Sequence, residues 1–262
     1  MSKIITPNDD FKDRLIEIGD KLNRFVIPVF LTGKFGRPEM EGTGFFLRHN
    51  NKLYFVTASH IIDAAHLRKS SINVAVNGKI INLENPVIKR VILKETEEAD
   101  KTLDIAIIQI SENFIYYETC SLQCIDSQKT MYGRSFNKID IQLLQGFPVS
   151  KNKPVKCIDK NNKTFNAGLW TYSFSFYINC DFKKFNKNPS THYSIVWSNK
   201  IKGQKTVHPS GCSGGPYWFV PDQFKTDNFY LAGIFIEYYK KSSVAFVTKI
   251  EQVIALIEYK NT

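Results

Sequence analysis

The chain has 262 residues, of which 43% are hydrophobic and 23% are charged, as is usual for a folded soluble protein of one or two domains. No apolar stretch approaches the length of a membrane-spanning helix, so the composition excludes a helical membrane protein and we expect no membrane partner. The formal net charge is +10, which raises the question of an acidic or nucleic-acid partner.

The N-terminal region predicts a helix. Thr6 can cap it, Pro7 suits its first position, and two aspartates follow in the first turn. Apolar residues then recur at helical spacing, at Phe11, Leu15, Ile18 and Leu22. We expect this helix to end near Asn23 and to pack its apolar side on the first group of strands that follows.

Short β-rich runs begin at Phe25, separated by turns rich in Asn, Gly and charged residues. A further apolar run near Ile139 opens the second half of the chain and ends in Gly146-Phe147-Pro148. Helical spacing returns only over Ile250–Tyr259, which predicts a C-terminal amphipathic helix. The strands expected in the first half are Phe25–Leu31, Gly42–Arg48, Lys52–Thr57, Ile72–Val76, Val87–Leu93 and Ile105–Ile110.

The cysteines and the N-terminus bear on the compartment of the protein. Met1–Pro7 contains neither the long apolar core nor the small-residue cleavage site of a secretory signal. The five cysteines are odd in number and show no zinc-site spacing, so we expect free thiols, no metal and a cytoplasmic location. They are Cys120, Cys124, Cys157, Cys180 and Cys212.

A serine between glycines near the C-terminus suggests acyl-transfer chemistry. Gly211 precedes Cys212 and Ser213, and Gly214-Gly215-Pro216 follow. Glycine permits a sharp turn whose successive N–H groups converge on one point, where they can bind an oxyanion while the serine hydroxyl attacks a carbonyl. A serine is a weak nucleophile, so it needs a base and a group that orients the base.

Candidates for both groups lie upstream of the serine. An apolar strand ends in Thr57-Ala58-Ser59-His60, and Asp104 opens the apolar strand Ile105–Ile110. These two segments and Gly211–Pro216 resemble, in sequence and in chain order, the histidine, aspartate and nucleophile motifs of the trypsin/chymotrypsin-like serine proteases. The match is closest to compact, disulfide-free bacterial members of that family.

The resemblance implies an all-β fold of two six-stranded antiparallel barrels of the chymotrypsin type, flanked by an N-terminal and a C-terminal helix. The implied parts are the helix over 1–24, a first barrel over 25–125 with His60 and Asp104, and a second barrel over 126–262 with Ser213. The resemblance is clear over Gly42–Ile110 and His208–Lys249 and weak over Asn152–Lys205.

The implied activity is that of a serine endopeptidase on a protein or peptide substrate, without metal or cofactor. Ser213 would be the nucleophile, His60 the general base and Asp104 the orienting group, and the N–H groups of Gly211 and Ser213 would form the oxyanion hole. A protease-like binding module that has lost turnover, and that docks a protein or nucleic acid, is the alternative.

The resemblance also implies where a substrate side chain would bind. Val207 falls at the floor of the specificity pocket, and His208 follows it. The wall strand contains Ile236, Glu237 and Tyr238, and Tyr238 stands where an open pocket would have a glycine. An apolar floor and a bulky wall predict an uncharged, small-to-medium side chain at the cleaved position.

Activation and control are a second expectation from the same motif. Members activated by cleavage carry an aspartate directly before the nucleophile, where this chain has Cys212. We therefore expect activity without N-terminal processing. The catalytic loop is either constitutively competent or released by a regulatory protein partner or by assembly, and we favour control by a partner.

Most of the net charge lies in one segment. Lys151–Lys205 contains eleven lysines and two aspartates, which leaves +9, interleaved with Trp170, Tyr172, Phe174 and Phe176 at alternating positions. The segment is either a surface for nucleic acid or an acidic partner, or a strand with a core face of aromatics and solvated lysine edges. We favour the second interpretation because no nucleic-acid-binding signature accompanies the charge.

Overall fold

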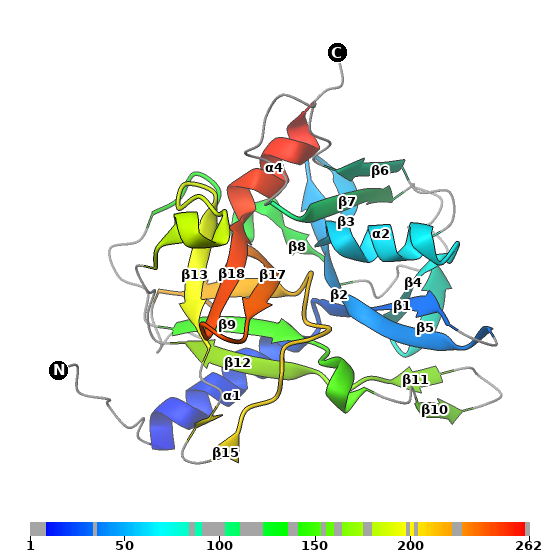
Figure 1. Ribbon diagram of the computed structural model, residues 1–262, viewed down its shortest axis with the longest axis horizontal. Helices are drawn as coiled ribbons and strands as arrows, with labels where there is room; N and C mark the ends of the chain where they lie inside the picture. The colour runs from blue at the N-terminus through cyan, green and yellow to red at the C-terminus, as the bar shows by residue number, and fades with distance from the viewer. Residues whose placement is uncertain are drawn as a thin grey trace.

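The computed structural model describes residues 9–33, 36–83, 87–90, 103–110, 123–135, 141–152, 156–159, 164–174, 180–197, 200–201, 204–221 and 227–259. Over these residues the protein is all-β, with two main sheets and a helix at each of two opposite ends (Figure 1). The predicted fold class is confirmed. None of the described helices is long and apolar enough to cross a membrane.

The larger sheet curls into a half-barrel and contains ten strands in the order β10-β11-β5-β4-β1-β2-β3-β7-β6, with β8 paired to β2. The six strands expected in the first half are present over the described residues, and β4 and β7 have the expected bounds. The sheet is larger than six strands because β5, β8, β10 and β11 also join it. Its strands are β1 (Val26–Thr32), β2 (Pro38–His49), β3 (Lys52–Ala58), β4 (Ile72–Val76), β5 (Lys79–Asn82), β6 (Val87–Arg90), β7 (Ile105–Ile110), β8 (Ile125–Asp126), β10 (Lys156–Asp159) and β11 (Thr164–Asn166).

The second sheet has six antiparallel strands in the order β12-β9-β16-β17-β18-β13. Its strands are β9 (Ile141–Gly146), β12 (Trp170–Phe174), β13 (His192–Val196), β16 (Pro216–Val220), β17 (Tyr230–Tyr239) and β18 (Val244–Lys249). The short hairpin β14 (Lys200–Ile201) and β15 (Gln204–Lys205) stands apart from both sheets. The described residues also form the 3-10 helices η2 (Ser127–Lys129), η3 (Val149–Lys151) and η4 (Phe182–Phe185).

The two halves of the chain are interleaved at the predicted boundary after residue 125. Strand β8 spans that boundary and pairs with β2 of the larger sheet. The hairpin β10–β11 comes from the second half, yet Thr164 pairs with Lys79 of β5. The larger sheet is therefore built from both halves of the chain.

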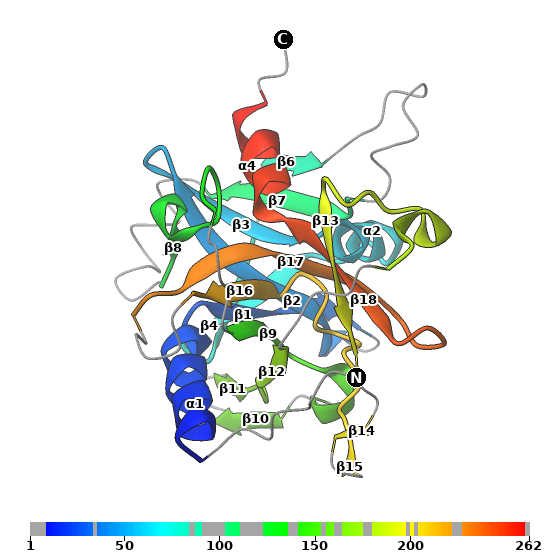
Figure 2. The ribbon, with the colours of Figure 1, turned by 90° about the vertical axis from the view of Figure 1, so that its left-hand side faces the viewer.

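The terminal helices are α1 (Asp9–Asn23) and α4 (Ile250–Glu258), which lie at opposite ends of the molecule in Figure 1 and Figure 2. The expected end at Asn23 is confirmed, while Thr6 and Pro7 lie outside the described residues. The apolar face of α4 is buried as expected, through Ile250, Val253, Ile254 and Ile257.

The expected packing of α1 on the first group of strands is wrong. The side chain of Gln145 in β9 donates to the carbonyl oxygen of Gly19, and Gly19 lies against Thr171 of β12. Both strands belong to the six-stranded sheet. The buried residues Ile18 and Leu22 of the helix lie in the core cluster that the six-stranded sheet shares with the larger sheet.

That core cluster spans both sheets. It contains Phe45 of β2 and Val56 of β3 together with Trp218 of β16 and Phe246 of β18, all fully or almost fully buried. A second cluster fills the curl of the larger sheet beneath the helix α2 (Ser59–Leu67), which the strand pattern did not predict. The interface between the sheets is thus closely packed apolar core.

Candidate active site

The first two candidate residues are brought together by strand pairing. In the antiparallel pair β3–β7, Ala58 lies opposite Ile105. His60 follows β3 in the first turn of α2, and Asp104 directly precedes β7. The end of one strand and the start of its neighbour therefore place the two side chains side by side.

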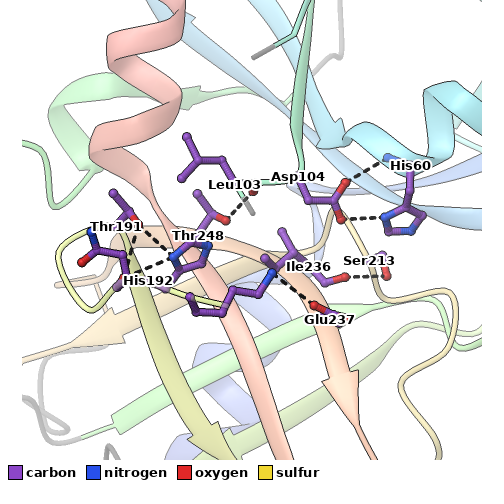
Figure 3. Close-up of polar contacts among 11 residues, drawn as sticks. His60, Leu103, Asp104, Thr191, His192, Ser213, Ile236, Glu237 and Thr248 are labelled. Carbon is purple, nitrogen blue, oxygen red and sulfur yellow. Dashed lines mark hydrogen bonds and ion pairs between the residues drawn. The ribbon is translucent and has the colours of Figure 1, made fainter. Parts of the chain in front are cut away.

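Asp104 holds both the backbone and the ring of His60 (Figure 3). One carboxylate oxygen accepts from the backbone N–H of His60 at 2.9 Å, and the other lies 2.7 Å from ring atom Nδ1. Asp104 has φ of +47°, a strained conformation for a residue with a side chain. It is held by the backbone N–H of Ser59, which donates to its carbonyl oxygen, and by Thr248, which donates to the carbonyl oxygen of Leu103.

The environment of His60 makes it a stronger base than a free imidazole. Burial is the largest single influence and lowers its pKa. The hydrogen bond and charge of Asp104, with the more distant carboxylates of Glu41 and Asp63, act the other way and together raise the pKa of His60 above its ordinary value of 6.5. The Nδ1 contact with Asp104 leaves Nε2 to act as the proton acceptor.

The loop that carries Ser213 depends on its glycines. Gly211 has φ of +93° and Gly214 has φ of +87°, both in the region that favours glycine. A Cβ on Gly214 would lie 2.0 Å from the carbonyl oxygen of Thr43, and one on Gly211 would lie 2.6 Å from that of Phe147. The loop is therefore pressed against the larger sheet on one side and against the segment after β9 on the other.

Two backbone N–H groups of this loop are oriented by the carbonyls of their own peptide units. The carbonyl oxygen of Ser210 accepts from the N–H of Val149 at 2.7 Å, and that of Cys212 accepts from Gly215 at 2.8 Å. In a trans peptide the N–H points opposite to its carbonyl, so the N–H groups of Gly211 and Ser213 point away from those partners. Among the described residues, neither N–H has a hydrogen-bond acceptor within the chain.

Thr43 of β2 links this loop to the larger sheet. Its backbone N–H donates to the carbonyl oxygen of Ser213 at 2.9 Å, and its hydroxyl donates to that of Gly211 at 2.8 Å. The same hydroxyl accepts from the N–H of Phe147 at 3.0 Å. Sequence reasoning missed Thr43, because a buried threonine in a strand has no signal of its own.

Ser213 and His60 line one cavity of about 510 Å³. Among the described residues, the Ser213 hydroxyl donates to the carbonyl oxygen of Ile236 at 3.3 Å, and not to the imidazole of His60 (Figure 3). The lining residues are His60, Asp104, Lys187, His208, Pro209, Ser210, Ser213, Phe235, Ile236, Glu237 and Tyr238. The structure thus brings together the three candidate catalytic residues and four of the five candidate pocket residues.

Val207 is the fifth, and it is not among the lining residues. The rings of His208 and Tyr238 meet edge to face with centroids 5.4 Å apart. His208 and Tyr238, and not the predicted floor residue, therefore form this part of the cavity wall. Lys187 also lines the cavity, although its position in the lysine-rich segment gave no indication of this.

Cys212 stands directly before Ser213 and is fully buried. Burial raises the pKa of its thiol to about 12, so the side chain is neutral at physiological pH. Its sulfur lies 4.0 Å from the hydroxyl of Tyr172, and a Cβ on Gly146 would lie 2.8 Å from its Cβ. This residue therefore packs as a small apolar group.

The lysine-rich segment is described in part. Lys183 and Lys184 are exposed on η4, the ammonium of Lys151 lies 5.2 Å from the ring centre of Trp170, and Lys187 is buried. Tyr172 and Phe174 pack on the core as the strand interpretation expects, whereas Trp170 is 37% exposed and Phe176 lies outside the described residues. Its binding of nucleic acid or of an acidic partner stays untested.

Metal ligands and thiols are the remaining chemical groups of the described residues. No group of three or more His, Cys, Asp or Glu side chains there could hold a metal ion. Cys124, Cys180 and Cys212 are free thiols. Cys120 lies outside the described residues.

Comparison with known proteins adds little to this geometry. No family model matches the chain, and no curated protein matches it. One similar solved structure comes from work in which aromatic interactions drive the coupled folding and binding of the intrinsically disordered Sesbania mosaic virus VPg protein. That chain is 11% identical with a TM-score of 0.48, over 91% of this chain and 92% of that chain. A similarity of this extent carries no argument about function.

Proposed function

We propose that the protein is a serine endopeptidase that cleaves peptide bonds through an acyl-enzyme on Ser213. The observation that supports this most is the shared cavity. It is lined by a serine and by a histidine whose Nδ1 is held by a carboxylate. The loop that contains this serine also has two backbone N–H groups without an acceptor among the described residues.

In the proposed reaction, the Ser213 hydroxyl leaves the carbonyl of Ile236 by rotation about its Cα–Cβ bond and attacks the substrate carbonyl. His60 takes the hydroxyl proton, and Asp104 stabilises the imidazolium that forms. The N–H groups of Gly211 and Ser213 bind the tetrahedral oxyanion. The imidazolium returns its proton to the leaving amine, and water then hydrolyses the acyl-enzyme with His60 again as base.

A silent, protease-like binding module is the competing function. The contact of Ser213 with Ile236, in place of one with His60, is the observation that favours it. A hydrogen bond of 3.3 Å is long for a hydroxyl donor, and catalytic contacts often tighten only when substrate binds. The endopeptidase therefore remains the better-supported proposal.

The Ser213 loop favours an enzyme that needs no cleavage of its own chain. The carbonyls of Ser210 and Cys212 are already hydrogen-bonded within the chain, which supports an orientation of the Gly211 and Ser213 N–H groups that needs no cleavage. Cys212 is a neutral, buried thiol and provides no carboxylate for a new N-terminus. We propose that activity is controlled by a protein partner, and that the free thiols reflect a reducing, cytoplasmic compartment.

The test is covalent labelling by a fluorophosphonate, which reacts with an activated serine and not with a serine that is only exposed. Wild type should be labelled, and Ser213→Ala and His60→Ala should both lose labelling, since the two residues act as a unit. The matched control is Ser242→Ala, which removes an exposed hydroxyl from the turn between β17 and β18 and should label as wild type does.

Intact mass spectrometry after labelling identifies the modified species. A single adduct on the full-length chain supports the proposal. An unlabelled wild type with an intact fold would favour the binding module, and labelling that survives Ser213→Ala would place the nucleophile elsewhere.

A further inference from the structure

An ion pair in the wall of the cavity has no role in the proposed chemistry. The ammonium of Lys187 lies 3.1 Å from a carboxylate oxygen of Glu237 (Figure 3). Lys187 follows η4, and Glu237 lies in β17 beside the bulge at Ile236, whose carbonyl accepts the Ser213 hydroxyl. The pair is therefore close to the nucleophile but separate from it.

The two members of the pair are unequally exposed. The side chain of Lys187 is only 6% exposed, whereas that of Glu237 is 42% exposed. The Tyr239 hydroxyl is a second polar neighbour of the same carboxylate. Burial, together with the hydrogen bond to Glu237 and its charge, raises the pKa of Tyr239 to about 12. The structure thus fixes a carboxylate on the cavity wall, with its counter-ion beneath the surface.

We propose that Glu237, whose exposed carboxylate pairs with Lys187 on its buried side, selects a basic substrate side chain that lies against β17. The inference rests on the proposed function, since it takes the occupant of the cavity to be a peptide chain. It concerns a different side chain from the one at the cleaved position, where His208 and Tyr238 meet and an uncharged group is expected.

Whether a basic or an acidic substrate side chain is preferred depends on which charge of the protein lies nearest to it. The exposed carboxylate is the nearer charge for an occupant, and Asp104 adds a second negative charge to the lining. A substrate carboxylate would be repelled by both, while an ammonium or guanidinium would pair with Glu237. Removal of the Glu237 charge would leave the buried ammonium of Lys187 as the nearest charge and reverse the preference.

The experiment scans peptides that differ only by Lys or Glu at each position on the acyl side of the scissile bond. Cleavage is measured with the wild type, and binding is measured by fluorescence anisotropy with Ser213→Ala. At one position, wild type should favour Lys over Glu by about tenfold. Glu237→Gln should reverse that preference, whereas Lys187→Gln should keep it or strengthen it.

The controls change the same charge elsewhere. Glu17 lies on α1, at the opposite end of the molecule from α4 in Figure 1, and Lys241 lies in the exposed turn after β17. Neither Glu17→Gln nor Lys241→Gln should therefore alter the preference for Lys over Glu. Circular dichroism confirms that each variant is folded. A Lys preference that survives Glu237→Gln, or a wild type indifferent to charge at every position, overturns the inference.

The two readouts separate this inference from the proposed function. Charge-selective binding to Ser213→Ala without any cleavage by wild type would leave the inference standing and reject the endopeptidase. Cleavage without charge selection at any position would reject the inference alone.

Discussion

Replacement of Thr43 by valine should weaken both the fold and the proposed oxyanion hole of Gly211 and Ser213. Valine has nearly the same shape as threonine but lacks the hydroxyl that donates to the carbonyl of Gly211 and accepts from the N–H of Phe147. Both backbone groups are buried, and an unpaired buried polar group costs about 1–3 kcal/mol. With two such groups, Thr43→Val should lose at least about 2 kcal/mol of unfolding free energy.

The effect on reactivity follows from the same two contacts. The hydroxyl of Thr43 joins the peptide unit after Gly211 to the segment after β9, so its loss lets the oxyanion N–H groups shift. Outright loss of one oxyanion donor costs about 10²–10³ in kcat, and a displaced donor costs less. We expect the rate of fluorophosphonate labelling to fall by about tenfold.

The matched control is Thr43→Ser, which keeps the hydroxyl and removes one buried methyl group. It should lose about 1 kcal/mol and label at close to the wild-type rate. Urea unfolding followed by tryptophan fluorescence measures the first quantity, and the shift expected for Thr43→Val is about 1 M in the midpoint. Equal losses for the serine and valine variants would show that the methyl group matters and that the hydroxyl bridge does not.

Two further predictions concern the base and the loop. A raised pKa keeps His60 protonated to higher pH, so kcat/KM should rise with pH through a midpoint above 6.5. Glu41→Gln removes one carboxylate that raises the pKa of His60, so it should move that midpoint to lower pH. A midpoint that Glu41→Gln does not move would contradict this electrostatic explanation. Gly214→Ala should prevent formation of the reactive loop, since its Cβ would meet the carbonyl oxygen of Thr43 and its φ is +87°; labelling at the wild-type rate would contradict this.

Short sequence motifs were sufficient to predict the candidate site residues that lie at strand ends and in the glycine-rich turn. His60 and Asp104 sit where two apolar strands end and begin, and Ser213 lies between glycines, so short motifs in the right order were enough to propose them. The C-terminal helix was predicted for a similar reason, because its apolar spacing is complete within nine residues.

The rest of the site depends on contacts between distant segments. Lys187 reaches Glu237 across fifty residues of chain, from a segment whose many lysines read as a solvated surface. The packing of α1 was missed because an apolar stripe shows that a helix is covered without showing which sheet covers it. Val207 was predicted at the pocket floor from its position in the sequence, but it does not line the cavity, whereas His208 and Tyr238 do.

The core cluster shared by the two sheets limits how this cleft can move. A two-domain enzyme whose halves meet through a thin polar interface can open by hinge rotation, but here Phe45 and Val56 are packed in one cluster with Trp218 and Phe246. Such rotation would expose that shared core to water. If the proposed endopeptidase activity and partner control are correct, both act through the loops at the rim. The two sheets should melt as one cooperative unit.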